Sequence, residues 1–224
     1  MPKPVCVVVG AGKGLGSAIA RKFASEGFAV AVMARHGGFL DMLVERIVED
    51  GGDALAVPCD VTSHQAVVDA FHMVRRQLGD PAVLIYNAFR NDPAMALRDA
   101  PPEALLSSQK VNTFGALWCA QQVIPAMAEA GRGTLLFTTG SVILKPVPNH
   151  ALLGMGKAAL YAMANTLAGE VSGLGLHVAS VVIHGAIQPQ TPFDPDLIAQ
   201  AYWELHGEQA GSFRTELHFK GVPG

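Results

Sequence analysis

Residues 5–16 read VCVVVGAGKGLG, five apolar residues followed by a run in which every second residue is glycine. An unbroken apolar run suits a parallel strand that packs helices on both of its faces. Glycine allows the sharp backbone turn that follows, and helical spacing begins at Leu15. The stretch therefore predicts a buried strand, a tight glycine turn and a helix.

The same alternation of short apolar runs and helical patterns continues along the chain. Gly27, Gly51 and Gly79 follow three of the expected helices, where C-terminal caps belong. The pattern predicts an α/β fold, a Rossmann-like doubly wound parallel sheet of about seven strands with helices on both faces, as a single domain over residues 1–224. Strands are expected at residues 5–9, 29–33, 54–57, 82–86, 134–138, 177–183 and 213–219, and helices at 15–26, 39–49, 65–77 and 196–205, with further helices before the fifth and sixth strands.

The composition favours work on small molecules. Hydrophobic residues make up 50% of the 224 residues, and the formal net charge of -3 provides no broad basic field for nucleic acid or an anionic membrane. Three widely separated cysteines without a C-x-x-C pair are typical of reduced thiols, and no secretory or membrane-spanning segment is recognisable. We therefore expect a cytoplasmic protein that binds neither nucleic acid nor membrane, and we expect no metal site.

The glycine run is expected to bind an anion. Glycine lets the backbone approach a phosphate, and the amides at a helix N-terminus supply the positive end of a dipole. The spacing is G-x-x-x-G-x-G, because Leu15 or Ser17 stands where a strict G-x-G-x-x-G requires its last glycine. Taken alone, the loop also fits a tight turn that binds no ligand.

Polar landmarks follow the later strands in a fixed order, and with the glycine spacing they resemble the motifs of the short-chain dehydrogenases/reductases. The resemblance covers nearly the whole chain, with one departure at His184, where the family has proline. It implies catalytic roles for Asn112, Ser141 and Lys157. It also implies cofactor contacts from Gly10, Gly12, Gly14, Leu15, Gly16, Asp60, Val61, Asn87, Ala88, Lys157, Gly185 and Ile187. Each residue alone also has an ordinary explanation as a turn, a cap or a solvated charge.

The end of the second strand indicates the cofactor. A protein selective for NAD would place a carboxylate there for the ribose 2′-hydroxyl, whereas this chain has Arg35. Arg35 can meet a 2′-phosphate with charge-assisted hydrogen bonds, and Lys13 can add a second cation. The sequence therefore predicts NADP(H), against the alternative that Arg35 is an ordinary surface arginine.

A second departure lies four residues before Lys157. The family has tyrosine there, on one helical face with the lysine, and this chain has Leu153. A leucine cannot donate a proton, which removes a general acid worth roughly 10²–10⁴-fold in rate. We therefore expect this protein to bind the cofactor while ordinary alcohol or ketone chemistry is weak.

Several side chains are candidates to replace the missing acid. His150 is the first choice, since it lies on the same face if the helix has already begun. His184 is the second, and it equally fits an ordinary polar loop residue. Tyr161 and Tyr86 are expected to serve packing instead. An alternative is an imine or iminium substrate, which accepts hydride without a protein acid because its nitrogen already carries the charge.

Two functions follow from these observations. The first is an NADP(H)-dependent short-chain oxidoreductase of altered mechanism, which transfers hydride to or from a small apolar carbonyl or imine substrate. The second is a catalytically silent NADP(H)-binding sensor or assembly protein. The family resemblance also implies a homodimer or homotetramer packed through the helices around Asn112 and Lys157. A subunit interface would use the surplus of apolar residues on these helices, namely Leu117, Trp118, Val123, Leu152, Met155, Leu160, Met163 and Leu167.

Overall fold

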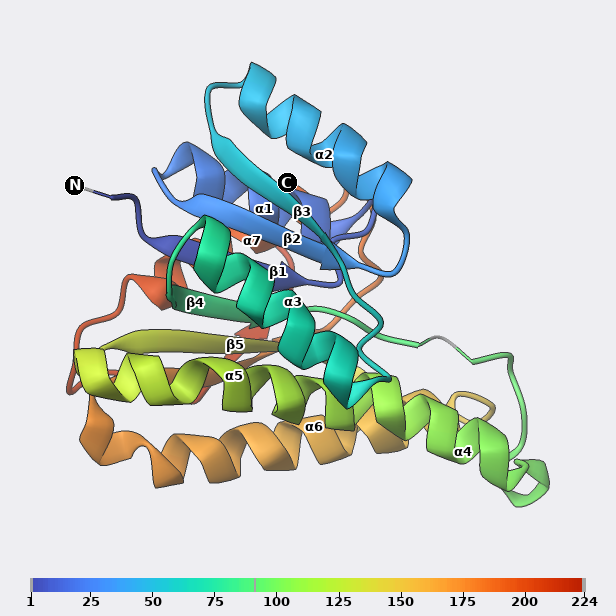
Figure 1. Cartoon of the computed structure of the whole chain (residues 1–224). Helices are drawn as coiled ribbons and strands as arrows, with labels where there is room; N and C mark the ends of the chain where they lie inside the picture. Colours follow the sequence, from blue (N-terminus) through green and yellow to red (C-terminus); the bar gives the residue numbers. More distant parts are fainter. Residues whose placement is uncertain (1, 91, 223–224) are drawn as a thin grey trace.

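The computed structural model describes residues 2–90 and 92–222, and within them seven parallel strands form one sheet. The strands are hydrogen-bonded in the order β3-β2-β1-β4-β5-β6-β7, so the direction of winding reverses between β1 and β4 (Figure 1). The strands are β1 (Val5–Val9), β2 (Ala29–Ala34), β3 (Asp53–Pro58), β4 (Pro81–Tyr86), β5 (Gly133–Gly140), β6 (Leu176–Ile183) and β7 (Glu216–Phe219).

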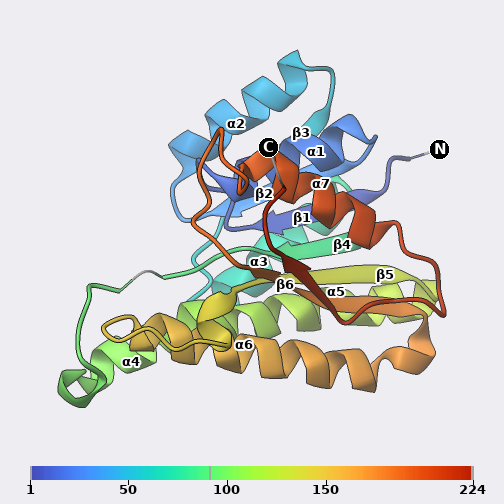
Figure 2. The same cartoon turned by 180° about the vertical axis from the view of Figure 1, so that it is seen from behind.

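Helices cover both faces of the sheet (Figures 1 and 2). One face carries α1 (Leu15–Ser25), α2 (Gly37–Glu49) and α7 (Pro195–His206). The other carries α3 (His64–Gln77), α5 (Gly115–Ala130) and α6 (Ala151–Glu170), and α4 (Pro102–Gln109) packs against α6. Short helical segments are η1 (Leu97–Asp99), the π-helix η2 (Lys110–Phe114), η3 (Ser141–Ile143) and η4 (Ser172–Leu174).

The alternating faces of β1 explain why its sequence is apolar throughout. Cys6 and Val8 pack in the core beneath α1 and α7, whereas Val5, Val7 and Val9 pack in the core beneath α3, α5 and α6. Each side of the strand therefore loses contact with water, which is the expected environment of a central parallel strand. The predicted Rossmann-like doubly wound sheet is confirmed.

The predicted helix ends are also confirmed. Gly27, Gly51 and Gly79 have φ values of 89°, 84° and 104°, a left-handed region that favours glycine. The predicted start of the last strand is wrong, because pairing with β6 begins at Glu216 and not at residue 213. Residue 213 lies in the loop before β7, where Phe213 stacks on the ring of His177 with ring centroids 4.4 Å apart.

Parallel strands bring all their carboxyl ends to one edge of the sheet, and the direction of winding reverses there between β1 and β4, which is where doubly wound sheets generally bind ligands. The glycine loop between β1 and α1 lies there, beside the segment that follows β4. No helix among the described residues is long and apolar enough to cross a membrane.

Candidate functional site

The glycine loop divides into two packed and two open glycines. A Cβ on Gly10 would lie 2.4 Å from the backbone nitrogen of Ala88, and one on Gly16 would lie 2.2 Å from the carbonyl oxygen of Gly10. A Cβ on Gly12 or Gly14 would meet no atom within 4 Å. The first pair therefore lets the chain pack tightly, and the second pair leaves the loop open to a ligand.

The first turn of α1 faces this open loop. Gly14 is the N-cap residue, and no side chain caps the helix start. Both the backbone nitrogen and the hydroxyl of Ser17 donate to the carbonyl oxygen of Gly12, at 3.1 and 2.6 Å, and hold the loop against the helix. Helix N-terminal amides without a capping side chain form a ready site for an anion.

The end of β2 presents Arg35 as an exposed side chain, and Lys13 is exposed on the glycine loop. Asp60, beyond β3, accepts hydrogen bonds from the backbone nitrogen and hydroxyl of Thr62 at 2.9 and 2.8 Å. The backbone hydrogen bond contributes most to lowering the pKa of Asp60, and the charge of Arg35 lowers it further. Asp60 therefore stabilises the turn before α3, whose N-cap residue is Ser63, and it also lies within the field of Arg35.

Asn87 connects the glycine loop to the centre of the sheet. Its side-chain nitrogen donates to the carbonyl oxygen of Gly10 at 3.0 Å, and its side-chain oxygen accepts from Thr138 at 3.1 Å. The Thr138 hydroxyl lies 2.7 Å from that of Tyr202 on α7. Because Thr138 donates to Asn87, Tyr202 supplies the proton of the second bond. Sequence patterns missed Thr138 and Tyr202, since a strand threonine and a helix tyrosine carry no motif.

Lys157 is buried on α6, and its ammonium donates to the carbonyl oxygen of Thr138 at 2.8 Å. Burial lowers the pKa of Lys157 to about 7, because removal from water disfavours the charged form. The lysine that the resemblance identified therefore points toward the carboxyl end of β5, where Ser141 follows in η3.

Asn112 lies in the π-helix and is fully buried. Its side-chain oxygen accepts from the backbone nitrogen of Arg90 at 3.0 Å, and its nitrogen donates to Ser108 at 3.0 Å. A Cβ on Gly156 would lie 2.5 Å from the Cβ of Asn112, so α6 passes close to the π-helix. Asn112 therefore connects α4 to the segment that follows β4. It also packs against α6 at Gly156, the residue before Lys157.

The structure does not place His150 on the helix that carries Leu153, where the sequence analysis expected it. Leu153 lies half-buried on α6, but the helix begins at Ala151, and His150 is the exposed residue before it. The condition that placed His150 on the same helical face as Leu153 is therefore not met. A small cavity does bring both residues together, lined also by Asp92, Pro93, Met95, Asn149 and Leu152.

The loop after β6 packs back on the sheet. A Cβ on Gly185 would lie 2.3 Å from the ring of Phe193, so glycine is needed for this close approach. Ile187 is exposed, and α7 already begins at Pro195, which leaves a short segment over the site. His184 bonds to His218 in β7, a partner that sequence reasoning missed because the two lie 34 residues apart.

Tyr86 and Tyr161 have structural partners. Tyr86 is fully buried and donates to the carbonyl oxygen of Val111, while Tyr161 lies 2.5 Å from a carboxylate oxygen of Glu216. The apolar surplus is smaller than predicted, because half of its members pack in the chain's own core. The buried members are Val123, Leu152, Leu160 and Leu167. An oligomer stays a prediction that depends on the other half.

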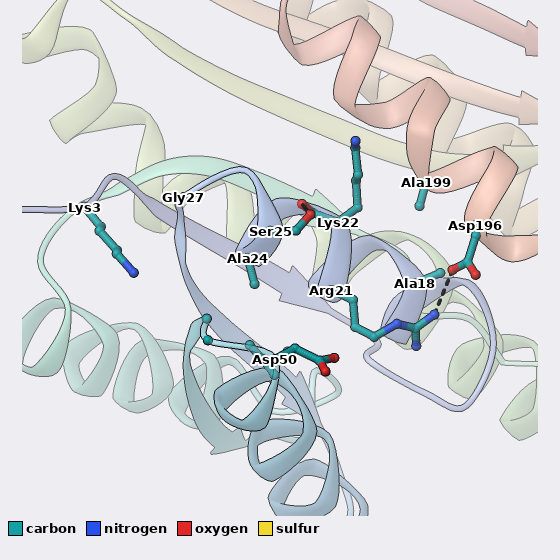
Figure 3. A pocket seen from close by; sticks show the side chains of 13 residues that line it. Lys3, Ala18, Arg21, Lys22, Ala24, Ser25, Gly27, Asp50, Asp196 and Ala199 are labelled. Atoms are coloured by element: carbon teal, nitrogen blue, oxygen red, sulfur yellow. Dashed lines mark hydrogen bonds and ion pairs between the residues drawn. The ribbon is translucent and has the colours of Figure 1, made fainter.

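A larger surface groove, of about 570 Å³, lies along α1, between the end of α2 and the start of α7 (Figure 3). Its cations are paired with acids: Lys3 with Asp53 at 2.9 Å, Arg21 with Asp196 at 2.7 Å, and Lys22 with Glu26 at 2.6 Å. The groove therefore does not share the chemistry of the glycine loop. Within residues 2–90 and 92–222, no group of three or more His, Cys, Asp or Glu side chains is placed to hold a metal ion.

Comparison with known families agrees with this geometry. The family model described as short chain dehydrogenase matches residues 4–194. The chain belongs to the short-chain dehydrogenase family. A metagenomic short-chain oxidoreductase solved in complex with NADP is 27% identical, with a TM-score of 0.90 over 97% of each chain. A short-chain dehydrogenase from Rhodopseudomonas palustris is 25% identical, with a TM-score of 0.89 over 98% of this chain and 99% of that one.

Sequence relatives within the family differ in length and in the activity that their names describe. The 3-oxoacyl-[acyl-carrier-protein] reductase of Bos taurus is 30% identical over 184 residues, which cover 82% of this chain and 75% of the relative. The human Short-chain dehydrogenase/reductase 3 is 29% identical over 72% of this chain. The match spans 53% of that human protein and 59% of a Fatty acyl-CoA reductase from Mycobacterium tuberculosis.

Proposed function

We propose that this protein is an NADP(H)-dependent oxidoreductase that transfers hydride to or from a small apolar carbonyl or imine substrate. The observation that carries the proposal is the open face of Gly12 and Gly14 beneath an uncapped helix start, with Arg35 exposed at the end of the neighbouring strand. The NADP complex of the metagenomic relative supports the same cofactor.

The residues present fit such a cofactor. Gly12 and Gly14 leave free the volume that a Cβ would enter, and the amides at the start of α1 suit a pyrophosphate. Arg35 offers a planar fork for a 2′-phosphate, where a carboxylate would repel it. Asn87 holds the carbonyl oxygen of Gly10 and so fixes the shape of the loop.

The chain's own groups divide the remaining work. When bound, the nicotinamide supplies the hydride. Lys157 would hold the ribose, Ser141 would donate a hydrogen bond to the reacting oxygen or nitrogen, and Asn112 keeps α6 and the segment after β4 in place. Leu153 has no proton to give, so the proposed mechanism takes its proton from another group or from a substrate that is already protonated.

A second candidate is a catalytically silent NADP(H)-binding protein. Leu153 favours it, because an apolar side chain occupies the helical position one turn before Lys157. The retained Asn112, Ser141 and Lys157 favour the enzyme, since binding alone does not require a buried amine with a pKa near 7.

Titration with nicotinamide nucleotides tests the cofactor. We expect the wild type to bind NADP(H) more tightly than NAD(H), and Arg35→Ala to raise the Kd for NADPH about 10- to 100-fold, because hydrogen bonds to charged groups contribute about 1.5–3 kcal/mol. The same variant should leave the Kd for NADH nearly unchanged.

Arg76→Ala is the matched control, because Arg76 is also an exposed arginine but lies in the last turn of α3. It should leave both affinities unchanged. Tighter binding of NAD(H) by the wild type, or saturable binding of neither nucleotide, contradicts the proposal.

A further inference from the structure

A chain of polar side chains leads from the carboxyl edge of the sheet to α6. Nε2 of His184 lies 2.8 Å from Nδ1 of His218, and Nε2 of His218 lies 3.5 Å from a carboxylate oxygen of Glu216. The other oxygen of Glu216 lies 2.5 Å from the hydroxyl of Tyr161. These four titratable groups, from the residue after β6, from β7 and from α6, therefore form a continuous chain of hydrogen-bond and ion-pair contacts.

Strand register places the first member of this chain beside Ser141. Gly140 of β5 pairs with Ile183 of β6, so Ser141 and His184 are each the first residue beyond the sheet on neighbouring strands. The backbone nitrogen of His184 donates to the carbonyl oxygen of Phe219 at 2.9 Å, which fixes its position at this edge. His184 therefore stands next to the residue proposed to bind the reacting atom.

The alternation of β7 explains how the chain continues. Leu217 and Phe219 pack toward the core beneath α1 and α7. Glu216 and His218 therefore lie on the opposite face, the one that α6 covers. Tyr161 is one helical turn beyond Lys157 on α6, and its contact with Glu216 ties the edge strand to the helix that carries the lysine.

We propose that His184, supported by His218, Glu216 and Tyr161, holds and delivers the proton that the substrate needs when hydride arrives. This inference rests on the proposed function and names the group that stands in for the absent phenol. His184 is the catalytic residue of the four. His218, Glu216 and Tyr161 are positioning residues that act through it.

The proton balance uses one added proton on the histidine pair. With that proton, Nδ1 of His184 carries hydrogen, while the bond between the two rings keeps its own hydrogen. As hydride adds to the substrate carbon, the electron pair of the double bond moves to the heteroatom and takes the proton from Nδ1. The N–H bond breaks, the O–H or N–H bond of the product forms, and the pair returns to its neutral state. Substrate oxidation runs the same transfer backwards.

Charged groups around the pair set the direction of its pH dependence. His184 is faced by His218 and Glu216 from β7, by Lys220 beyond β7, by Lys145 beyond η3, and through Glu216 by Tyr161 of α6. Partial burial lowers the pKa of His184, and the charges of His218, Lys220 and Lys145 lower it further. Reduction should therefore be fastest at low pH and fall as the pH rises through this lowered value, since the acid must be protonated.

The test compares His184→Ala with His150→Ala in hydride transfer from NADPH to a panel of ketones and imines. We expect His184→Ala to lower kcat for ketone reduction about 10²–10⁴-fold and to abolish the acidic pH limb, with NADPH affinity unchanged. His150→Ala should behave like the wild type. His218→Asn should lower kcat less than His184→Ala does and should move the pH limb upward, because it removes a positioning partner and a neighbouring positive charge.

A second readout needs no cofactor. The imidazole resonances of His184 in the apo protein should titrate below the ordinary histidine range, and His218→Asn should move that titration upward. His72→Asn, at an exposed histidine on α3, is the matched control and should leave that titration unchanged.

The outcomes separate this inference from the proposed function. Loss of NADPH binding or of all hydride transfer in the wild type overturns the proposed function, and the inference with it. An active wild type with an equally active His184→Ala, or a His184 titration that His218→Asn does not move, overturns the inference alone.

Discussion

Two side chains on α6 decide what chemistry is available at this site. Lys157 is buried with a pKa of about 7, and Leu153 lies one turn before it without a polar atom to offer. A lysine in this environment can bind a ribose, and its own charge changes near neutral pH. Position 153 offers no phenol for it to activate. These two side chains therefore determine whether the protein reduces ordinary ketones or depends on another acid.

Leu153→Tyr tests this point. In the His184→Ala background, we expect this substitution to increase NADPH-dependent ketone reduction about 10²–10⁴-fold, because it restores a general acid within one helical turn of Lys157. Imine reduction should change little, since its nitrogen already carries the proton. The assay is NADPH oxidation with matched ketones and imines.

Leu144→Tyr is the control, because Leu144 is an exposed leucine near the same site. It should leave both rates unchanged. A His184→Ala, Leu153→Tyr double variant that binds NADPH normally but recovers no ketone reduction contradicts the role assigned to position 153.

At the level of elements, the site depends on how closely α6 approaches the π-helix η2. Gly156 lies against Asn112, and Lys157 follows it directly. The π-helix widens the turn that carries Asn112, a feature that often accompanies functional sites. Helix packing, and not the loop alone, therefore positions the lysine.

Gly156→Ala should destabilise the protein by about 1–3 kcal/mol, because its Cβ would lie 2.5 Å from Asn112 in a filled core. It should also weaken NADPH binding, since α6 must move away with Lys157. Gly154→Ala is the matched helix control, because its Cβ would lie 3.3 Å from the half-buried side chain of Val142. Chemical denaturation of both variants checks the difference, and equal stabilities would contradict the packing argument.

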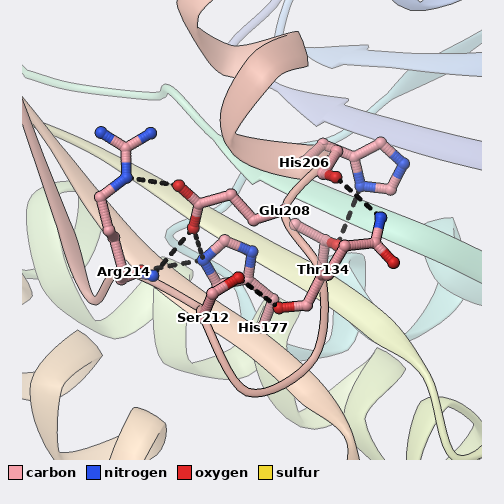
Figure 4. Close-up of polar contacts among 8 residues, drawn as sticks. Thr134, His177, His206, Glu208, Ser212 and Arg214 are labelled. Carbon is pink, nitrogen blue, oxygen red and sulfur yellow. Dashed lines mark hydrogen bonds and ion pairs between the residues drawn. The ribbon is translucent and has the colours of Figure 1, made fainter.

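Across the whole molecule, chemistry and stability occupy opposite edges of the sheet. The carboxyl edge holds the glycine loop, Ser141 and His184, whereas the amino edge holds a polar cluster that ties α7 and the loop before β7 to β5 and β6 (Figure 4). In that cluster, Nε2 of the buried His177 lies 2.8 Å from the carbonyl oxygen of Arg214 and 3.7 Å from Glu208. Nδ1 of His206 lies 2.9 Å from Thr134.

This cluster should make stability depend on pH. Burial lowers the pKa of His177 and of His206, so the unfolded chain binds protons more readily than the folded one. Stability is therefore full above the ordinary histidine pKa of about 6.5 and is lost as the pH falls below it. We expect the Tm of His177→Asn to fall less between about pH 7 and pH 5 than that of the wild type. His72→Asn serves as control, and parallel Tm curves for His177→Asn and the wild type would refute the assignment.

Local patterns were enough to predict the layered fold, the place of the glycine loop and the order of the polar landmarks, because residue periodicity, glycine positions and the order of strands along the chain can be read from neighbouring residues. Gly27, Gly51 and Gly79 are examples, since each cap depends only on its own helix. The folded structure was needed to find the pairing of His184 with His218, the link from Thr138 to Tyr202 and the place of His150 outside α6. The two pairs join residues from separate elements. Their distances depend on strand register and helix packing, which no local pattern contains.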